Sequence, residues 1–236
     1  MVKNTGMIFG IGIGPGEADM LTKRAVDCMR AADILCLPQS PKEVCRAYRV
    51  AVEAVPEIAQ KNCLCFDFKM TLNVAEMERF HNEAYREVFD LYQKGYKVAF
   101  LTIGDPAVYS TFGYILDKAR HDQLNFEVIS GIPSFCASAA CLGITLCEGS
   151  EELHIGTGQS DLDKLLSNSG TIIIMKCGRN IQKIKNRLLL LEQEEGAVVY
   201  TVSECGMPDE KKYYGAEAIP VDIGYMSTII VKKSRP

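Results

Sequence analysis

Short apolar runs alternate with longer amphipathic stretches along most of the chain. Residues 7–13 (MIFGIGI), 98–101 (VAFL) and 171–176 (TIIIMK) are apolar nearly throughout, whereas residues 75–94 carry apolar side chains at steps of three and four. Short continuous runs are typical of parallel strands buried on both faces, and the second spacing is that of a helix with one buried face. The pattern therefore predicts an α/β fold, in which helices cover a largely parallel sheet.

The remaining elements continue this alternation through both halves of the chain. Helices are expected from Leu21 and at 111–120, 134–143 and 181–191, and strands at 34–37, 63–68, 126–129, 197–202 and 226–232. The polar stretch 121–125 (HDQLN) interrupts the pattern, as a linker between domains does. We therefore expect two α/β domains, residues 1–120 and residues 121–236.

The composition is that of an ordinary globular protein. Of its 236 residues, 47% are hydrophobic and 24% are charged, and the formal net charge is −4. The clustered cations Lys232, Lys233 and Arg235 are too few for a nucleic-acid surface. No stretch approaches the roughly 20 uncharged apolar residues of a membrane span. We expect a soluble, cytoplasmic protein with neither a nucleic-acid nor a membrane partner.

The cysteines and histidines do not follow a metal-binding pattern. Ten cysteines are present without a C-x-x-C pair, and only Cys63 and Cys65 lie close together. The three histidines are far apart in the sequence. We interpret most of the cysteines as small buried apolar side chains in a reducing compartment, and we expect no metal ligands.

Three expected strands end in loops of glycine and small polar residues. These loops are Gly14-Pro15-Gly16, Gly104-Asp105-Pro106 and Ser130-Gly131-Ile132-Pro133-Ser134. Glycine permits close approach to the backbone, and amides at the start of a following helix bind polar groups. Taken alone, the Gly104-Asp105-Pro106 corner is equally compatible with a simple tight turn. Loops of this kind from two domains, meeting in one cleft, would bind a polar molecule of medium size.

The first loop invites comparison with dinucleotide-binding proteins. Their motif, G-x-G-x-x-G, places its third glycine three positions after the second. In residues 10–16 (GIGIGPG) the glycines alternate instead, Pro15 lies in the loop, and no clear ribose-binding acid follows a second strand. The spacing argues against a dehydrogenase, although a dinucleotide-binding redox or regulatory module with Cys63 and Cys65 as a switch remains an alternative.

The motifs together resemble those of the tetrapyrrole methylases, enzymes that use S-adenosylmethionine to methylate uroporphyrinogen and corrin precursors. The resemblance covers residues 7–232. The residues that carry it are, in chain order, Gly12-Ile13-Gly14-Pro15-Gly16-Glu17 with the Leu21-Thr22 that completes this first motif, then Gly104-Asp105-Pro106, Ser130-Gly131-Ile132-Pro133-Ser134, Met175-Lys176 and Glu204-Cys205-Gly206. Five motifs in the family's order are unlikely to arise by chance.

Within this family, the sequence is most similar to the branch that methylates carbon 20 of precorrin-2 or cobalt-precorrin-2. The stretches behind this similarity are Phe66-Asp67-Phe68-Lys69-Met70-Thr71, Tyr109-Ser110-Thr111 and Ile174-Met175-Lys176-Cys177-Gly178-Arg179-Asn180. The sequence departs from the usual pattern at Glu17, Lys69 and Met207, and the last of these bears on the cofactor contact near Gly206. A methylase for another corrin carbon, or a diphthine synthase, is the alternative within the family.

The resemblance implies two α/β domains with S-adenosylmethionine folded into a cleft between them, in a homodimer. The residues that it implies for the cofactor are Pro15 at the entrance, Ile103, Gly104, Asp105 and Val108 at the methionine and ribose parts, Pro133 and Ser134 at the carboxylate or amine, and Met175, Gly206 and Ser227 on the adenine side. For the tetrapyrrole substrate it implies Tyr109, Lys176 and Arg179.

The chemistry implied by the resemblance makes few demands on catalytic side chains. A sulfonium methyl is already activated, and an electron-rich meso carbon attacks it in line, so the protein mainly supplies proximity and a dry cleft. Asp105 is a candidate for a base that removes the ring proton, although a role in cofactor binding is favoured. Either form of the substrate fits, because the ring nitrogens would hold the cobalt.

Overall fold

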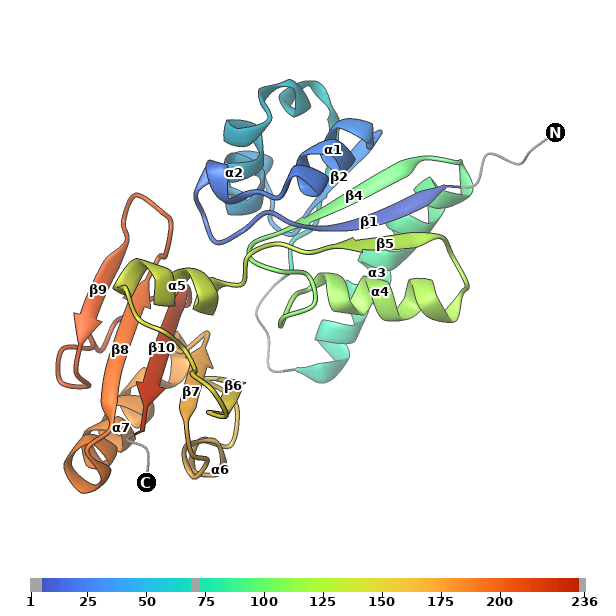
Figure 1. Cartoon of the computed structure of the whole chain (residues 1–236). Coiled ribbons are helices and arrows are strands. Elements are labelled where there is room, and N and C mark those ends of the chain that lie inside the picture. The colour runs from blue at the N-terminus through green and yellow to red at the C-terminus, as the bar shows by residue number, and fades with distance from the viewer. Residues whose placement is uncertain (1–5, 69–72, 234–236) are drawn as a thin grey trace. The chain divides into compact units, whose positions relative to one another are not determined.

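The chain folds into two compact units, Met1–Pro133 and Ser134–Pro236. A computed structural model describes residues 6–68 and 73–233, and each unit contains one five-stranded sheet (Figure 1). The boundary follows Pro133 instead of residue 120, because β5 (Phe126–Ile129) pairs with β1 (Met7–Gly12). The polar stretch 121–125 is thus a turn within the first unit, and the expected linker position was wrong.

The sheet of the first unit is entirely parallel. Its strand order is β3-β2-β4-β1-β5, with β2 at Ile34–Leu37, β3 at Asn62–Cys65 and β4 at Lys97–Thr102. Residues 98–101 of β4 are fully buried, as expected for a strand covered on both faces. The carboxyl ends of β1, β4 and β5 therefore lie side by side at one edge.

Four helices cover the two faces of this sheet. They are α1 (Lys23–Ala31), α2 (Arg46–Ala54), α3 (Val74–Gln93) and α4 (Phe112–His121). Figure 1 shows α1 and α2 on one face and α3 and α4 on the other. Helix α1 begins at a Thr22 cap, whose side chain accepts a hydrogen bond from the Ala25 amide. Short 3-10 turns lie at Ala18–Met20, Lys42–Val44 and Pro56–Gln60.

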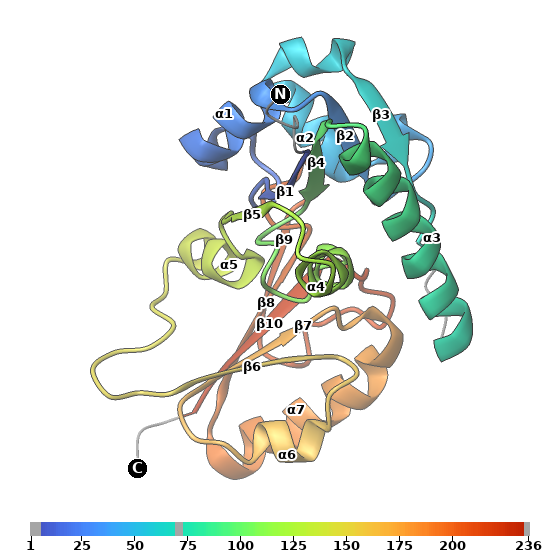
Figure 2. The same ribbon diagram turned by 90° about the vertical axis from the view of Figure 1, so that its right-hand side faces the viewer.

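Aromatic side chains fill the layer between the sheet and the helices α3 and α4. Figure 2 shows these two helices beside each other. The Phe100 ring lies 5.7 Å from that of Phe112 and 6.2 Å from that of Phe66, measured between centroids. Phe68 is partly buried and packs against the same cluster. The first part of the 66–71 motif is therefore core, while its residues Lys69, Met70 and Thr71 lie outside the described residues.

His81 on α3 gives this layer a pH dependence. Its ring stacks on Tyr114 with centroids 3.6 Å apart, and burial together with the charge of Lys118 lowers its pKa. The unfolded chain therefore protonates this ring at a higher pH than the folded chain does. We expect the free energy of unfolding to fall as the pH drops below about 6.5, and to fall less in His81→Phe. Thermal melts between about pH 7 and pH 5 test this expectation.

His121→Phe is the control for this measurement, since the His121 side chain is 88% exposed. Its melting temperature should still fall as the pH drops below about 6.5, because His81 is retained. An unchanged pH dependence in His81→Phe would contradict the assignment to His81.

The sheet of the second unit is mixed. Its order is β6-β7-β10-β8-β9, and only β6 (Leu153–Thr157) and β7 (Thr171–Met175) run parallel. Strand β10 (Ser227–Lys232) is antiparallel to both β7 and β8 (Val198–Ser203). The end of β7, the start of β10 and the end of β8 therefore meet at one edge. Strand β9 (Lys211–Tyr214) pairs with β8 in the antiparallel sense.

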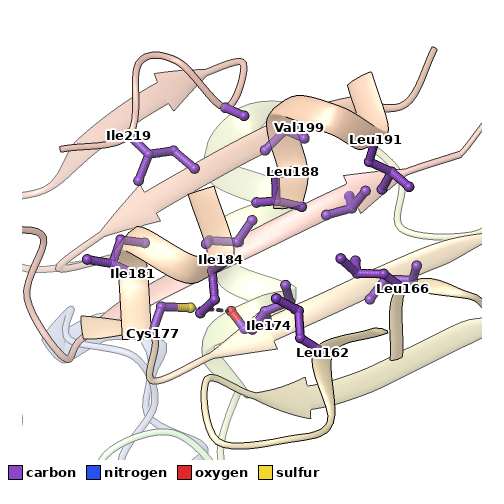
Figure 3. Close-up of a cluster of buried hydrophobic side chains, with 14 of the residues drawn as sticks. Leu162, Leu166, Ile174, Cys177, Ile181, Ile184, Leu188, Leu191, Val199 and Ile219 are labelled. Atoms are coloured by element: carbon purple, nitrogen blue, oxygen red, sulfur yellow. Dashed lines mark hydrogen bonds between the residues drawn. The ribbon is translucent and has the colours of Figure 1, made fainter. Parts of the chain in front are cut away.

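The core of the second unit lies between its sheet and α7 (Ile181–Glu195). Figure 3 shows Ile181, Ile184, Leu188 and Leu191 of α7 directed at the side chains of β7 and β8. Helix α6 (Leu162–Leu166) adds Leu162 and Leu166 to this cluster, and α5 (Ser134–Leu142) packs against β10. A 3-10 turn at Gly178–Asn180 precedes α7.

The described helices include none with the length and apolar character needed to cross a membrane. The expected strands and helices are present, and four further helices and strands of the described chain were not expected: α2, β6, α6 and β9. Strand β9 (KKYY) has a mostly exposed surface and therefore lacks an apolar signal.

Candidate functional site

Three loops meet backbone to backbone at the carboxyl edge of the first sheet. The Gly104 amide donates to the Gly14 carbonyl at 2.7 Å, and Gly14 donates in return at 3.3 Å. A Cβ built on Gly131 would lie 2.2 Å from the Gly104 oxygen, and one on Gly12 would lie 2.6 Å from the Gly131 nitrogen. These glycines are required because the loops pack against one another, which also explains why their spacing departs from the dinucleotide motif.

Asp105 joins two of these loops. Its Oδ1 accepts a hydrogen bond from the Ala107 amide at 2.7 Å, and its Oδ2 accepts one from the Gly131 amide at 3.1 Å. Only 8% of the residue is exposed. The first bond belongs to the simple tight turn that the sequence analysis considered for Gly104-Asp105-Pro106. The second bond connects this turn to the loop after β5. The carboxylate thus fixes the relative position of the two motifs.

The other predicted residues of the first unit lie on the same loops. Pro15 is buried, and Ile103, Val108 and Pro133 are half-buried. The Val108 amide donates to the Asp105 carbonyl at 3.2 Å. The structure therefore brings all the cofactor residues predicted in this unit to one sheet edge, as parallel strand ends require. Tyr109 follows them and is 46% exposed.

A second set of predicted residues gathers at one edge of the second sheet. Met175 of β7 pairs with Thr228 of β10, and the preceding residue of β10, Ser227, pairs with Ser203 of β8. The Ser134 hydroxyl lies 3.4 Å from that of Thr228. Met175, Ser227 and Ser134 are thus neighbours, and Gly206 follows the end of β8 at the same edge.

Backbone conformation marks several of these positions. The non-glycine residues with positive φ among those described are Tyr109 (47°), Gln123 (54°), Lys176 (58°) and Glu204 (55°). Such conformations carry strain that the surrounding structure must hold, and they concentrate at functional sites. Three of the four lie in the predicted motifs. Glu204 belongs to a recognised motif but was not predicted as a site residue, because its conformation leaves no sign in the sequence.

The predicted substrate cations lie on the loop that follows β7. The Lys176 amide donates to the Ser227 carbonyl at 3.2 Å, and its ammonium lies 5.4 Å from the centroid of the Tyr225 ring. Arg179 is exposed on the 3-10 turn. This turn packs tightly, since a Cβ on Gly178 would lie 3.2 Å from the Gly224 carbonyl carbon. A rigid loop therefore presents both cations.

The C-x-C pair of β3 does not have the properties of a redox switch. Burial raises the pKa of both Cys63 and Cys65. A thiol with a raised pKa contains little of the reactive thiolate at neutral pH. This observation disfavours the redox alternative.

Comparison with known proteins decides the family. A family model described as Tetrapyrrole (Corrin/Porphyrin) Methylases matches residues 7–218. The chain belongs to the tetrapyrrole methylases. A relative in Methanocaldococcus jannaschii, named probable cobalt-precorrin-2 C(20)-methyltransferase, is 31% identical over 96% of each chain. The cobalt-precorrin-2 C(20)-methyltransferase of Salmonella typhimurium is 26% identical over 97% of each chain.

Solved structures show the same tetrapyrrole methylase fold. A cobalt precorrin-4 methyltransferase superposes with a TM-score of 0.73 at 18% identity, covering 96% of this chain and 94% of that one. The uroporphyrin-III C-methyl transferase of Thermus thermophilus, complexed with S-adenyl homocysteine, gives 0.71 at 18% identity, with 96% and 97% covered. The predicted α/β fold of the tetrapyrrole methylase type is confirmed, whereas the mixed sheet of the second unit was not predicted.

Proposed function

We propose that this methylase transfers a methyl group from S-adenosylmethionine to carbon 20 of precorrin-2 or cobalt-precorrin-2, in cobalamin biosynthesis. The observation that carries the proposal is the similarity, over nearly the full length of both chains, to relatives named for that reaction. The branch motifs agree with this assignment, since Tyr109-Ser110-Thr111 follows the Gly104-Asp105-Pro106 loop after two intervening residues.

The chemistry of the two sheet edges fits the proposed cofactor. The carbon chain of its methionine part and the faces of its adenine ring are apolar, while its amine, carboxylate, ribose and adenine edge need hydrogen-bonding groups. In the first unit, apolar Pro15, Ile103 and Val108 lie beside Gly104 and Asp105. In the second, Met175 lies among hydroxyl groups, with Gly206 at the same edge. We propose Pro133, Ser134 and Ser227 as further contacts of the cofactor's polar groups.

The chain's own residues then hold the reactants in place. When bound, S-adenosylmethionine supplies an activated methyl group on a positively charged sulfur. Asp105 positions the two loops through its bonds to Ala107 and Gly131, so its proposed role is organisation of the site. Lys176 and Arg179 offer positive charge to the substrate's carboxylates, and the exposed Tyr109 ring offers an apolar face. A cytoplasmic homodimer completes the proposal.

Asp105→Asn separates a positioning role from that of a base. Asparagine keeps one acceptor oxygen, but its NH2 group opposes one of the two amides, so we expect a loss of about 1 to 3 kcal/mol in the free energy of unfolding. Methyl transfer should remain within about tenfold of the unmodified rate, because no essential proton acceptor is lost. A kcat loss of about 100-fold or more with unchanged stability would instead identify Asp105 as the base.

Incubation with carbon-13-methyl S-adenosylmethionine and either precorrin-2 or its cobalt complex tests the proposed reaction. We expect a product heavier by one CH2 and a labelled methyl resonance at carbon 20. A label on another carbon would refute the position while sparing the family, and transfer to neither macrocycle would refute the reaction. Cofactor binding is tested by comparing the melting temperature of the protein with S-adenosylmethionine and with NAD. A rise in melting temperature with NAD alone would contradict the cofactor assignment.

A further inference from the structure

Two thiols and a carboxylate converge in the second unit. Sγ of Cys141, Sγ of Cys205 and a carboxylate oxygen of Glu210 all lie within 4.8 Å of one another. Cys141 is in the last turn of α5, Cys205 follows β8, and Glu210 immediately precedes β9. Because the two cysteines are 64 positions apart in the chain, no spacing motif in the sequence indicates the cluster. The tertiary fold alone assembles it.

We propose that Cys141, Cys205 and Glu210 form a binding site for a zinc ion. Thiolate and carboxylate ligands suit zinc, which binds sulfur at about 2.3 Å and oxygen at about 2.0 to 2.2 Å in a tetrahedron. Neighbouring ligands in that geometry lie about 3.5 to 3.8 Å apart, so small side-chain rotations bring these three into place. Water completes the coordination as the fourth ligand.

The fully buried hydroxyl of Ser138 points to a ligand at the same place. Ser138 is 0% exposed, and among the described residues its Oγ has no hydrogen-bond partner. It lies on α5 one turn before Cys141, and therefore on the same side of the helix. An unsatisfied buried hydroxyl is costly. Donation to a zinc-bound Cys205 thiolate would satisfy it and would orient the ligand.

The charges around the cluster also balance when a zinc ion is bound. Zinc binding replaces two S–H bonds by two Zn–S bonds and releases two protons to solvent, so no oxidant is needed. Two thiolates and one carboxylate carry three negative charges, which one zinc ion and the Lys212 ammonium neutralise. The Lys212 ammonium lies 3.6 Å from Glu210 Oε1 and donates to the Cys141 carbonyl at 2.7 Å.

Existing hydrogen bonds hold the ligands in place. The Cys141 thiol donates to Glu210 Oε1 at 3.0 Å, and the Gly206 amide donates to Glu210 Oε2 at 2.9 Å. These bonds fix Glu210 beside Cys141, as shared coordination of one zinc ion requires.

Zinc titration of the full chain, reduced and stripped with a chelator, tests the proposal. With a chromophoric chelator as competitor, we expect one tight site per chain and release of about two protons per zinc in weakly buffered solution. Cobalt(II) in place of zinc should give thiolate-to-metal charge-transfer absorption. Cys141→Ser and Cys205→Ser should each weaken zinc binding by roughly 100-fold or more, and Glu210→Gln should weaken it as well.

Cys136→Ser is the matched control, since Cys136 is an exposed cysteine on the same helix as Cys141. It should bind zinc as the unmodified chain does, and circular dichroism should show that each variant is folded. Tight binding retained in both Cys141→Ser and Cys205→Ser would overturn the proposal. Failure of the reduced chain to bind zinc would also overturn the proposal. If peptide mass spectrometry then finds a Cys141–Cys205 disulfide after exposure to air, the two cysteines form a redox pair instead.

Discussion

Gly131→Ala should disrupt the first unit at the predicted cofactor loops. The added Cβ would lie 2.2 Å from the Gly104 oxygen and 2.8 Å from the Gly12 carbonyl carbon. Both are backbone atoms, so relief requires the strand ends themselves to move apart. We expect a loss of about 3 kcal/mol in the free energy of unfolding. Where the variant still folds, displaced loops should lower kcat/KM for methyl transfer by roughly 100-fold.

Gly113→Ala is the control for the same substitution. Gly113 lies in α4, and a Cβ there would meet no atom within 4 Å. Alanine is the better helix former by up to about 1 kcal/mol, so stability should stay equal or rise slightly. Urea unfolding and methyl-transfer kinetics of both variants provide the comparison. Equal behaviour of the two alanine variants would show that the junction is not tightly packed.

Leu188→Ala should have the largest effect on the second unit. Leu188 is 0% exposed and lies at the centre of the cluster that α7 forms with the sheet (Figure 3). Truncation leaves a cavity in a close-packed interior, for which we expect a loss of about 3 kcal/mol in the free energy of unfolding. Amide hydrogen exchange of β7 and β10, measured by mass spectrometry, reports this loss for the second unit by itself.

Leu190, two residues further along α7, provides a matched control. Its side chain is 46% exposed, so Leu190→Ala removes few contacts. We expect a change under about 0.5 kcal/mol. Similar exchange rates in the two variants would contradict the assignment of the core to the Leu188 face of α7.

The expected elements of the first unit agree with the structure because burial on both faces leaves a clear apolar signal. Strand β4 (Lys97–Thr102) and strand β2 (Ile34–Leu37) were expected from such runs. Strand β5 was also expected, but its sheet was not, since the Phe126–Ile129 run does not reveal that its partner is β1. The domain boundary was therefore placed too early.

Half-exposed elements left weaker signals. Strand β9 (Lys211–Tyr214) contains two lysines, and it pairs with a single neighbouring strand, β8. Strand β6 (Leu153–Thr157) also lies at a sheet edge, paired only with β7. A strand at a sheet edge is stabilised by pairing with its neighbour, and this stabilisation leaves no apolar pattern in the sequence from which the strand could be predicted.

In the functional site, too, some features were predicted from the sequence and others depend on the tertiary structure. The sequence located the loops after β1, β4 and β5 from glycine and small polar residues, and the structure brings them to one edge. The reason for the glycines differs, since Gly12, Gly104 and Gly131 are needed for contact between the loops themselves. The left-handed backbone of Glu204 and the second bond of Asp105 are likewise tertiary features.

By itself, the sequence determined the α/β class, most of the elements and the family, because these depend on local periodicity and on short motifs in a fixed order. Only the tertiary structure decided which sheet β5 joins, that Asp105 bridges two motifs, and that Cys141, Cys205 and Glu210 converge. Each of these depends on contacts between residues distant in the chain. Strand pairing and helix packing create such contacts, and no local pattern of residues encodes them.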